Sequence, residues 1–347
     1  MTVTRADVAA LAGVSPALVS YVINGGPRPV SPEARRRVES AIERLGYRPN
    51  AIASALRGGL SRTVALLVGG QDNPYYAELS EAIGEELFIH GYALTVAATK
   101  NDPRREAVHI QSALAHRVDG FVVTSAQAVK TLRRVSSELI PVVAVDLTEA
   151  EHYGASSVVS GNAASARRAT EHLQAHGHRL IGCVTGDRSR PAAVERVIGW
   201  REQQVLRGAS AAESLVAYAP FSMEGGYEAA VELLDLRVTS ARCERPTALM
   251  VASDVQATGV LAACADLGLR VPDEVAVASL DGTRFARFTR PSLTSVRQPL
   301  GDMAHILVEM LLERVAHPEL PPEQIVLAGN LVIGRSCGCD VSLPAHP

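Results

Sequence analysis

The sequence predicts a small all-α N-terminal headpiece followed by a larger α/β body whose parallel strands form doubly wound sheets in two lobes. Three observations carry this prediction. A chain of 347 residues has room for two or three domains. Residues 1–62 hold nine arginines and four acids, whereas the rest of the chain holds 25 basic and 33 acidic side chains. Apolar strand-like runs begin at Thr63 and from there alternate with helical stretches.

Three short helices are predicted in residues 1–48. Residues 4–12 form the first, Ser15-Pro16 opens the second, and Ser31-Pro32 opens the third, because serine caps a helix and proline suits its first position. Two short helices around a glycine-containing turn, with a third behind them, describe a helix-turn-helix domain. The concentrated arginines and outward-facing helix N-termini favour contact with DNA over a generic three-helix bundle.

A short helix and a linker are predicted in residues 49–62. Asn50 is a good N-cap, and Gly58-Gly59 ends the helix. The helix has only about two turns, which is too short to be stable alone in water.

The body, residues 63–340, has buried-looking strands separated by helices. The predicted strands are 64–68, 93–97, 120–123, 142–145, 180–184, 248–251 and 275–279, and the intervening helices include 75–90, 161–176, 191–207, 224–236, 255–267 and 299–316. These strands are too many for one tidy sheet, so two lobes are expected. Ligands of such folds bind at the carboxyl ends of the strands.

Composition and termini predict a soluble cytoplasmic protein. No apolar run approaches the roughly 18–20 residues that a membrane span needs, and no secretory signal opens the chain. The five cysteines are odd in number and scattered, which indicates reduced thiols rather than a disulfide framework.

Motifs for catalysis, cofactors and metals are weak. No nucleophile elbow, phosphate-binding loop or dinucleotide fingerprint occurs, so we expect neither an enzyme nor a cofactor. His172, His176 and His178 are close in sequence, but Gly177 interrupts them, which favours a turn between a helix and a strand. The pair Cys337-Gly-Cys339 could bind metal or sense redox state, yet no partner pair is evident. No metal site is therefore predicted.

Three segments of the headpiece form a specific pattern: Asp7-Val-Ala-Ala-Leu-Ala-Gly-Val-Ser15, Val19-Ser-Tyr-Val-Ile-Asn24 and Leu45-Gly-Tyr-Arg-Pro-Asn50. This pattern resembles the DNA-binding segment of the LacI/GalR family of bacterial repressors. The resemblance implies a helix-turn-helix domain in residues 1–48 and a hinge helix with its linker in residues 49–62.

The resemblance also implies roles for single residues. Pro16, Ala17 and Tyr21 would read bases in the major groove. Phosphates would be held by Ser15, Ser20, Asn24, Ser31 and Asn50. The hinge helix would fold on the operator, with Leu56 as a minor-groove wedge beside Arg57, although Leu56 could instead pack on the core. Many relatives have Thr and Arg where this chain has Leu18 and Tyr21, so its base preference should differ from theirs.

The body resembles the same family more loosely, through Asn73-Pro-Tyr-Tyr-Ala-Glu78, Arg196-Val-Ile-Gly-Trp200 and Pro291-Ser-Leu-Thr-Ser-Val-Arg-Gln298. This implies a periplasmic-binding-protein-like core that the chain crosses three times, with a short tail at 341–347. The expected N-lobe comprises residues 63–159 and 291–322. The expected C-lobe comprises residues 160–290 and 323–340.

An effector would bind between these lobes. By family position Arg196 and Asp281 would grip hydroxyls or a charged group, assisted by Asp146, Ser253 and Gln298. Phe221 would stack on the ligand, although it could also be a core residue, and Tyr75 and Tyr76 would line the other lobe. Relatives often have Asn where Ser253 stands and a second Asp where Gly282 stands, which indicates a differently tuned pocket.

The function that the resemblance implies is a repressor whose operator affinity is controlled by a small polar effector, preferably a sugar. The alternative is a corepressor-dependent regulator that binds a purine or another non-sugar metabolite. A homodimer is expected rather than a tetramer, because no leucine-heptad tail follows Cys339. Such a dimer would read a palindromic operator. A solute-binding protein would need a signal peptide and no helix-turn-helix, and a sugar-processing enzyme would need a catalytic constellation.

Overall fold

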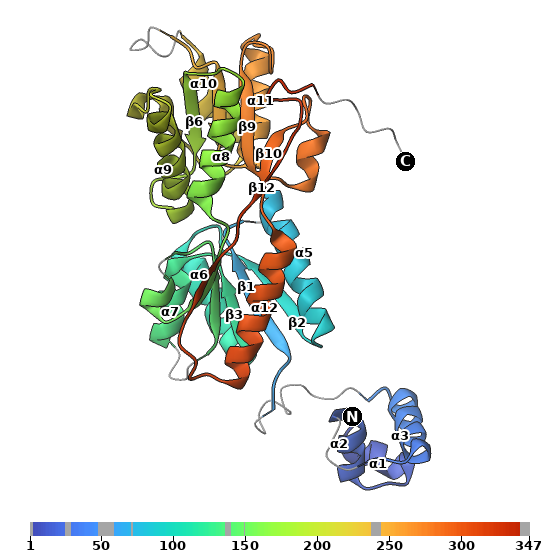
Figure 1. Ribbon diagram of the computed structural model, residues 1–347. Coiled ribbons are helices and arrows are strands. Elements are labelled where there is room, and N and C mark those ends of the chain that lie inside the picture. Colours follow the sequence, from blue (N-terminus) through green and yellow to red (C-terminus); the bar gives the residue numbers. More distant parts are fainter. Residues whose placement is uncertain are drawn as a thin grey trace. The chain divides into compact units, whose positions relative to one another are not determined.

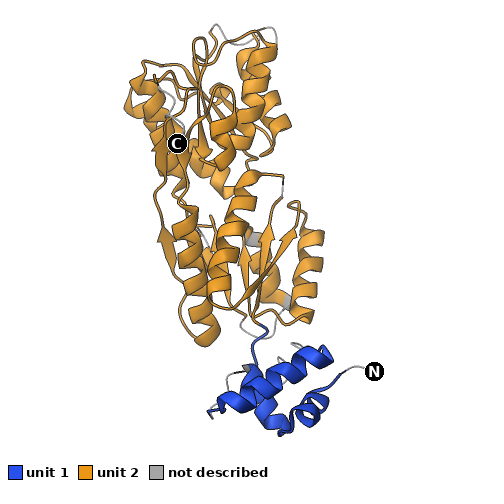
Figure 2. Cartoon of the chain, turned by 90° about the vertical axis from the view of Figure 1, so that its right-hand side faces the viewer, with its two compact units in different colours: residues 1–61 blue, residues 62–347 orange. Residues whose placement is uncertain are grey.

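The structure is a computed structural model that describes residues 3–24, 29–47, 59–70, 72–135, 140–148, 150–236 and 244–340. Residues 1–61 and 62–347 form two compact units (Figure 2). The predicted hinge helix, with Asn50, Leu56 and Arg57, and the tail at 341–347 lie outside the described residues.

The N-terminal unit contains the three predicted helices, α1 (Arg5–Ala12), α2 (Pro16–Asn24) and α3 (Pro32–Leu45). Thr4 and Asp7 form a capping box at the start of α1, and Gly13 ends it in the left-handed conformation. The axes of α1 and α2 are bent by 103°, within the range of a helix-turn-helix. Val8, Val19 and Val38, one from each helix, are fully buried and form the centre of its core.

In the described residues no single helix is long and apolar enough to cross a membrane. α1 and α2 reach that composition only as a bent pair.

The first lobe of the second unit is a parallel sheet in the order β11-β5-β4-β3-β1-β2. Its strands are β1 (Thr63–Val68), β2 (Ala93–Ala98), β3 (Gly120–Val123), β4 (Val142–Val145), β5 (Ser156–Val159) and β11 (Gln324–Val326). α5 (Pro74–Ile89) and α12 (Leu300–Ala316) cover one face, whereas α6 (Pro103–Ala115) and α7 (Ala126–Val135) cover the other (Figure 1). A 3-10 turn at Ala150–Tyr153 precedes β5.

The second lobe is a sheet in the order β12-β10-β9-β8-β6-β7, in which β12 alone runs antiparallel to its neighbour. Its strands are β6 (Ile181–Thr185), β7 (Val216–Tyr218), β8 (Ala248–Val251), β9 (Ala276–Asp281), β10 (Thr294–Arg297) and β12 (Asn330–Val332). α8 (Asn162–Ala175) and α9 (Pro191–Leu206) cover one face, and α10 (Met223–Leu234) and α11 (Asp254–Asp266) cover the other. Short 3-10 turns lie at Glu213–Leu215 and Arg284–Phe288.

The predicted doubly wound, two-lobed architecture is confirmed, but two of the predicted lobe boundaries are wrong. β10 was expected in the first lobe with residues 291–322, yet it pairs with β9 in the second sheet. β11 was expected in the second lobe with residues 323–340, yet it pairs with β5 in the first sheet. Strands of three or four residues carry too little periodicity to reveal which sheet they join, because strand pairing is decided by backbone partners that are distant in sequence. The chain therefore passes between the sheets after β5, between β10 and α12, and between β11 and β12.

Candidate functional site

The N-terminal end of α2 is a small polar surface on the first unit. Ser15 caps the helix by accepting a hydrogen bond from the Leu18 amide at 3.2 Å. Pro16 and Ala17 are exposed, and Ser20 and Tyr21 are partly exposed on the side away from buried Val19. Pro16 and Ala17 therefore lie at the N-terminus of α2, where backbone N–H groups also favour phosphate, and Tyr21 lies one turn further along the same face as Ala17.

Two of the other predicted phosphate contacts lie at further helix ends of this unit. Ser31 is the N-cap of α3 and accepts a hydrogen bond from the Ala34 amide at 3.2 Å. Asn24 is the last residue of α2. Backbone N–H groups at the N-terminal end of α3 suit a phosphate, so the position of Ser31 is favourable for such a contact.

A cavity of about 680 Å³ lies at the carboxyl ends of the strands and is lined by residues of both lobes. Its volume is in the range typical of small-molecule sites. Of the predicted effector residues, those that line it are Tyr75, Tyr76, Asp146, Arg196, Phe221, Ser253 and Asp281. Phe221 was left open between pocket and core, and the structure places it on the cavity wall.

On the first-lobe side, Asp146 is held in place by its neighbours. The backbone N–H and the hydroxyl of Ser160 each donate to Asp146 Oδ1 at 2.7 Å, and Tyr75 Oη donates to Asp146 Oδ2 at 3.2 Å. Asp146 adopts a positive φ of 50°, which turns its side chain out of the strand. Burial raises the pKa of both Tyr75 and Tyr76, so their phenols stay neutral and can donate hydrogen bonds.

On the second-lobe side, Arg196 is buried and held by three groups. Its Nε donates to Asn162 Oδ1 at 2.8 Å, and its Nη1 donates to the Ala252 carbonyl. Its Nη2 lies 3.7 Å from Asp281 Oδ1, and its Cζ lies 5.6 Å from the centre of the Phe221 ring. Because the guanidinium is preorganised, little side-chain entropy remains to be lost when a ligand binds.

Gln298 does not line this cavity, which corrects the expectation that it touches an effector. Its side chain is buried behind Asp281 and donates to Asp281 Oδ1 from Nε2 at 2.8 Å. Gln298 follows β10 directly, and that strand belongs to the second sheet beside β9 rather than to the first lobe. Its role in the structure is to position the Asp281 carboxyl group.

Polar residues that the sequence analysis did not select also line the cavity: Asn73, Lys100, Asn101, Asp187, Ser189, Arg190 and Ser222. Lys100 and Asn101 follow β2, and Asp187 follows β6. The rule that ligands bind at strand carboxyl ends would have found them had it been applied to every strand. No such local signal marks Asn162, which orients Arg196 from α8.

The pH dependence of folding should report on Asp281. Burial raises the pKa of its carboxyl group to about 8, with Arg196 lowering it and Asp254 and Asp146 raising it. The unfolded carboxyl titrates near 3.8. Between these values the folded state keeps a proton that the unfolded state loses, so this group makes the free energy of unfolding fall as pH rises.

Between pH 5 and 8 we expect the free energy of unfolding of the wild type to fall, relative to that of Asp281→Asn, by up to about 1.4 kcal/mol per pH unit. Above pH 8 the difference should stay constant. Denaturant titrations of both proteins from pH 5 to 9 would measure the difference. Parallel curves over this range would show that Asp281 does not titrate there.

Comparison with known proteins places this architecture in a family. The sequence pattern of the lacI family of bacterial regulatory proteins matches residues 4–50, and that of periplasmic binding protein-like domains matches residues 170–337. The ribose operon repressor of Escherichia coli (strain K12) is 30% identical over 330 residues, which are 95% of this chain and 98% of that protein. The chain belongs to the LacI family.

Other relatives agree with this LacI-family assignment. The HTH-type transcriptional repressor PurR of Shigella sonnei (strain Ss046) is 31% identical over 335 residues, covering 96% of each chain. The solved structure of a transcriptional regulator CelR–cellobiose complex is 30% identical, with a TM-score of 0.71 over 96% of this chain and 99% of that one. The lac repressor dimer bound to operator and the anti-inducer ONPF shares the fold, with a TM-score of 0.83 and 24% identity over 97% of this chain and 99% of that one. This LacI-family protein is a DNA-binding transcriptional regulator and not an enzyme.

Proposed function

We propose that this LacI-family regulator is a cytoplasmic homodimeric repressor that reads a palindromic operator through Pro16, Ala17 and Tyr21. A sugar bound in the cavity between the lobes controls its affinity for the operator. The observation that carries the effector part is the placement of Arg196, Asp281 and Phe221 on one wall, with Asp146 and Tyr75 on the other.

The chemistry of the cavity suits a polyhydroxylated ring. Sugar hydroxyls both donate and accept hydrogen bonds, so they can pair with carboxyl groups and with a guanidinium in the same site. The face of a sugar ring is apolar enough to pack on Phe221, whereas its edge is polar. The names of two relatives, the ribose operon repressor and the CelR–cellobiose complex, support a sugar as the ligand class.

Relatives often have a second aspartate where this chain has Gly282. This difference favours an effector whose hydroxyl pattern differs from that of the sugars those relatives hold. The φ of Gly282 is +64°, and a Cβ atom built there would lie 2.3 Å from the Arg297 Cα. An aspartate at position 282 would therefore need a backbone shift. We infer that, at this end of β9, Asp281 is the acid that faces the effector.

Control of DNA binding follows from the way the chain crosses between the lobes. A ligand that contacts both walls favours one angle between the lobes over another, and this difference would be transmitted to residues 49–62. By thermodynamic linkage, operator DNA must change effector affinity by the same factor. The hinge segment, including Leu56 and Arg57, is proposed to contact the minor groove.

Selection of bound sequences from random duplex DNA tests this function. We expect the wild type to enrich a palindrome, with affinity that falls steeply with salt. Tyr21→Arg should enrich a different palindrome, because an arginine fork can bond guanine at two atoms at once, whereas a phenol offers a single O–H donor. Ser40→Arg adds the same charge on the exposed face of α3 and should keep the wild-type motif. An unchanged motif in Tyr21→Arg would remove Tyr21 from base reading.

The selected operator then allows effectors to be screened by release, with ribose, cellobiose, other pentoses and hexoses, and purines as probes. Release or strengthened binding by a sugar supports the proposal. A response confined to purines would contradict the sugar assignment while leaving the regulator intact. No enrichment of any DNA, with or without these probes, would contradict the DNA-binding role.

A further inference from the structure

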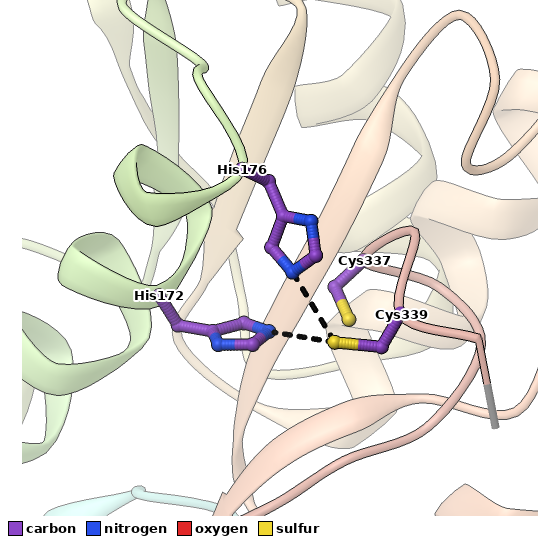
Figure 3. Close-up of side chains that lie close together, drawn as sticks. All are labelled: His172, His176, Cys337 and Cys339. Atoms are coloured by element: carbon purple, nitrogen blue, oxygen red, sulfur yellow. Dashed lines mark hydrogen bonds between the residues drawn. The ribbon is translucent and has the colours of Figure 1, made fainter.

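Two pairs of metal-ligating side chains meet on the second lobe, and none of them lines the cavity described above. His172 and His176 come from the C-terminal end of α8, and Cys337 and Cys339 follow β12 (Figure 3). One ligand atom from each residue can be chosen so that all four lie within 4.8 Å of one another. Each pair alone is a weak motif, so the sequence by itself predicts no metal site. The tertiary structure joins them into one cluster of two imidazoles and two thiols.

The histidines are brought together by helical geometry. His172 and His176 are four residues apart, so they share one face of α8. Their ring centres are 4.9 Å apart with an interplanar angle of 71°, and both rings point an Nε2 atom at Cys339 (Figure 3). Those Nε2 atoms lie 3.8 Å and 3.2 Å, respectively, from Cys339 Sγ.

The cysteines are brought together by a tight turn. Gly338 has a φ of +94°, which a residue with a side chain rarely adopts, and this reverses the chain between the two sulfurs. Ser336 fixes the segment by donating to the Val277 carbonyl at 2.6 Å and accepting from the Thr294 amide at 2.9 Å. Cys337 is 1% exposed and accepts a hydrogen bond from Thr294 Oγ1 at 2.9 Å. One sulfur is thus buried while Cys339 reaches the surface.

We propose that His172, His176, Cys337 and Cys339 bind one zinc ion in a closed tetrahedral site. Two thiolates and two imidazoles are a donor set typical of structural zinc. In such a site the Zn–S and Zn–N distances imply ligand atoms about 3.3–3.8 Å apart. The cluster therefore needs to contract by roughly an ångström, which rotation of the half-exposed His172 and exposed His176 side chains can supply.

Zinc would bind both cysteines as thiolates, because a coordinating thiol is deprotonated. The hydroxyl of Thr294 donates a hydrogen bond to Cys337 Sγ at 2.9 Å, and this bond would stabilise one of the two thiolates.

The expected consequence is a fixed attachment of residues 334–340 to α8. The opposite end of α8 carries Asn162, which holds Arg196 in the effector cavity. Metal binding would therefore stabilise the helix that positions a cavity residue, without touching the ligand. The proposed zinc site shares no residue with the proposed effector site, so a failed test of one proposal leaves the other standing.

Cobalt titration of untagged, reduced and chelator-treated protein tests the site. Co²⁺ in a tetrahedral thiolate site gives intense visible bands and a sulfur-to-metal charge-transfer band. We expect both bands to saturate at one Co²⁺ per chain and to disappear when Zn²⁺ is added. Zn²⁺ should also raise the Tm of the wild type in a concentration-dependent way.

Variants locate the ion. Cys339→Ser and His176→Gln change side chains at the surface, so both should fold, lose the charge-transfer band or weaken Co²⁺ binding at least tenfold, and lose the Tm response. His178→Gln is the matched control, because His178 lies two residues away but hydrogen-bonds Thr247 at 3.0 Å outside the cluster. It should bind Co²⁺ like the wild type.

The proposal is overturned if reduced wild type binds no Co²⁺, or if the spectrum lacks the charge-transfer band. It is also overturned if the cluster variants bind as well as His178→Gln, which would place the metal elsewhere. A further contrary outcome is a Cys337–Cys339 disulfide that forms in air and that prior addition of Zn²⁺ does not prevent.

Discussion

Arg196→Ala is expected to abolish the response to effector while leaving operator binding intact. The guanidinium is the centre of the second-lobe wall, where it contacts Asn162 and lies beside Asp281 and Phe221. Removing it takes away the fork that a ligand hydroxyl would meet. A hydrogen bond to a charged group contributes about 1.5–3 kcal/mol, so each such bond lost to the ligand lowers effector affinity by roughly 10–150-fold.

The matched control for this prediction is Arg201→Ala on the same helix. Arg201 is 43% exposed and pairs with Glu213 at the surface, so its removal should change neither effector affinity nor fold. The measurement is release of operator DNA by the sugar or purine that acts on the wild type, made with both Arg196→Ala and Arg201→Ala. A wild-type response in Arg196→Ala would move the effector site away from this cavity.

Gly226→Ala is expected to cause a large loss of folding stability. Gly226 lies on α10 where it crosses α11, and a Cβ atom there would approach the Gln256 carbonyl oxygen to 2.0 Å. A backbone carbonyl group cannot rotate away as a side chain can, so α10 and α11 must move apart. Overpacking of this kind costs about 3 kcal/mol or more, because neighbouring contacts between the helices are lost as well.

The control is Gly301→Ala, at the start of α12. A Cβ atom there meets no heavy atom within 4 Å, and alanine favours helix over glycine by up to about 1 kcal/mol. Thermal unfolding should show Gly301→Ala at or above the wild-type Tm and Gly226→Ala roughly 6–12 °C below it. Equal melting temperatures for Gly226→Ala and the wild type would mean that α10 and α11 do not pack this closely.

Much of the candidate site could be predicted because its signals are local. A carboxyl group or serine directly after an apolar run lies at a strand end, and parallel strands bring those ends to one edge of the sheet. Asp146, Ser253 and Asp281, which family position selects, stand just after predicted strands, and all three line the cavity. Gln298 was misplaced because its surroundings depend on which sheet β10 joins, and that is decided by pairing with β9.

The sequence by itself determined the elements: the capped helices of the headpiece, the apolar parallel strands of the body, and the strand-end residues around the cavity. These follow from propensities and periodicities that act over a few residues. Only the tertiary structure decided the sheets that β10 and β11 join, the support of Arg196 by Asn162, and the meeting of His176 with Cys339 across 163 residues. Such contacts depend on how distant segments pack and register against each other, and no short-range pattern in the chain encodes them.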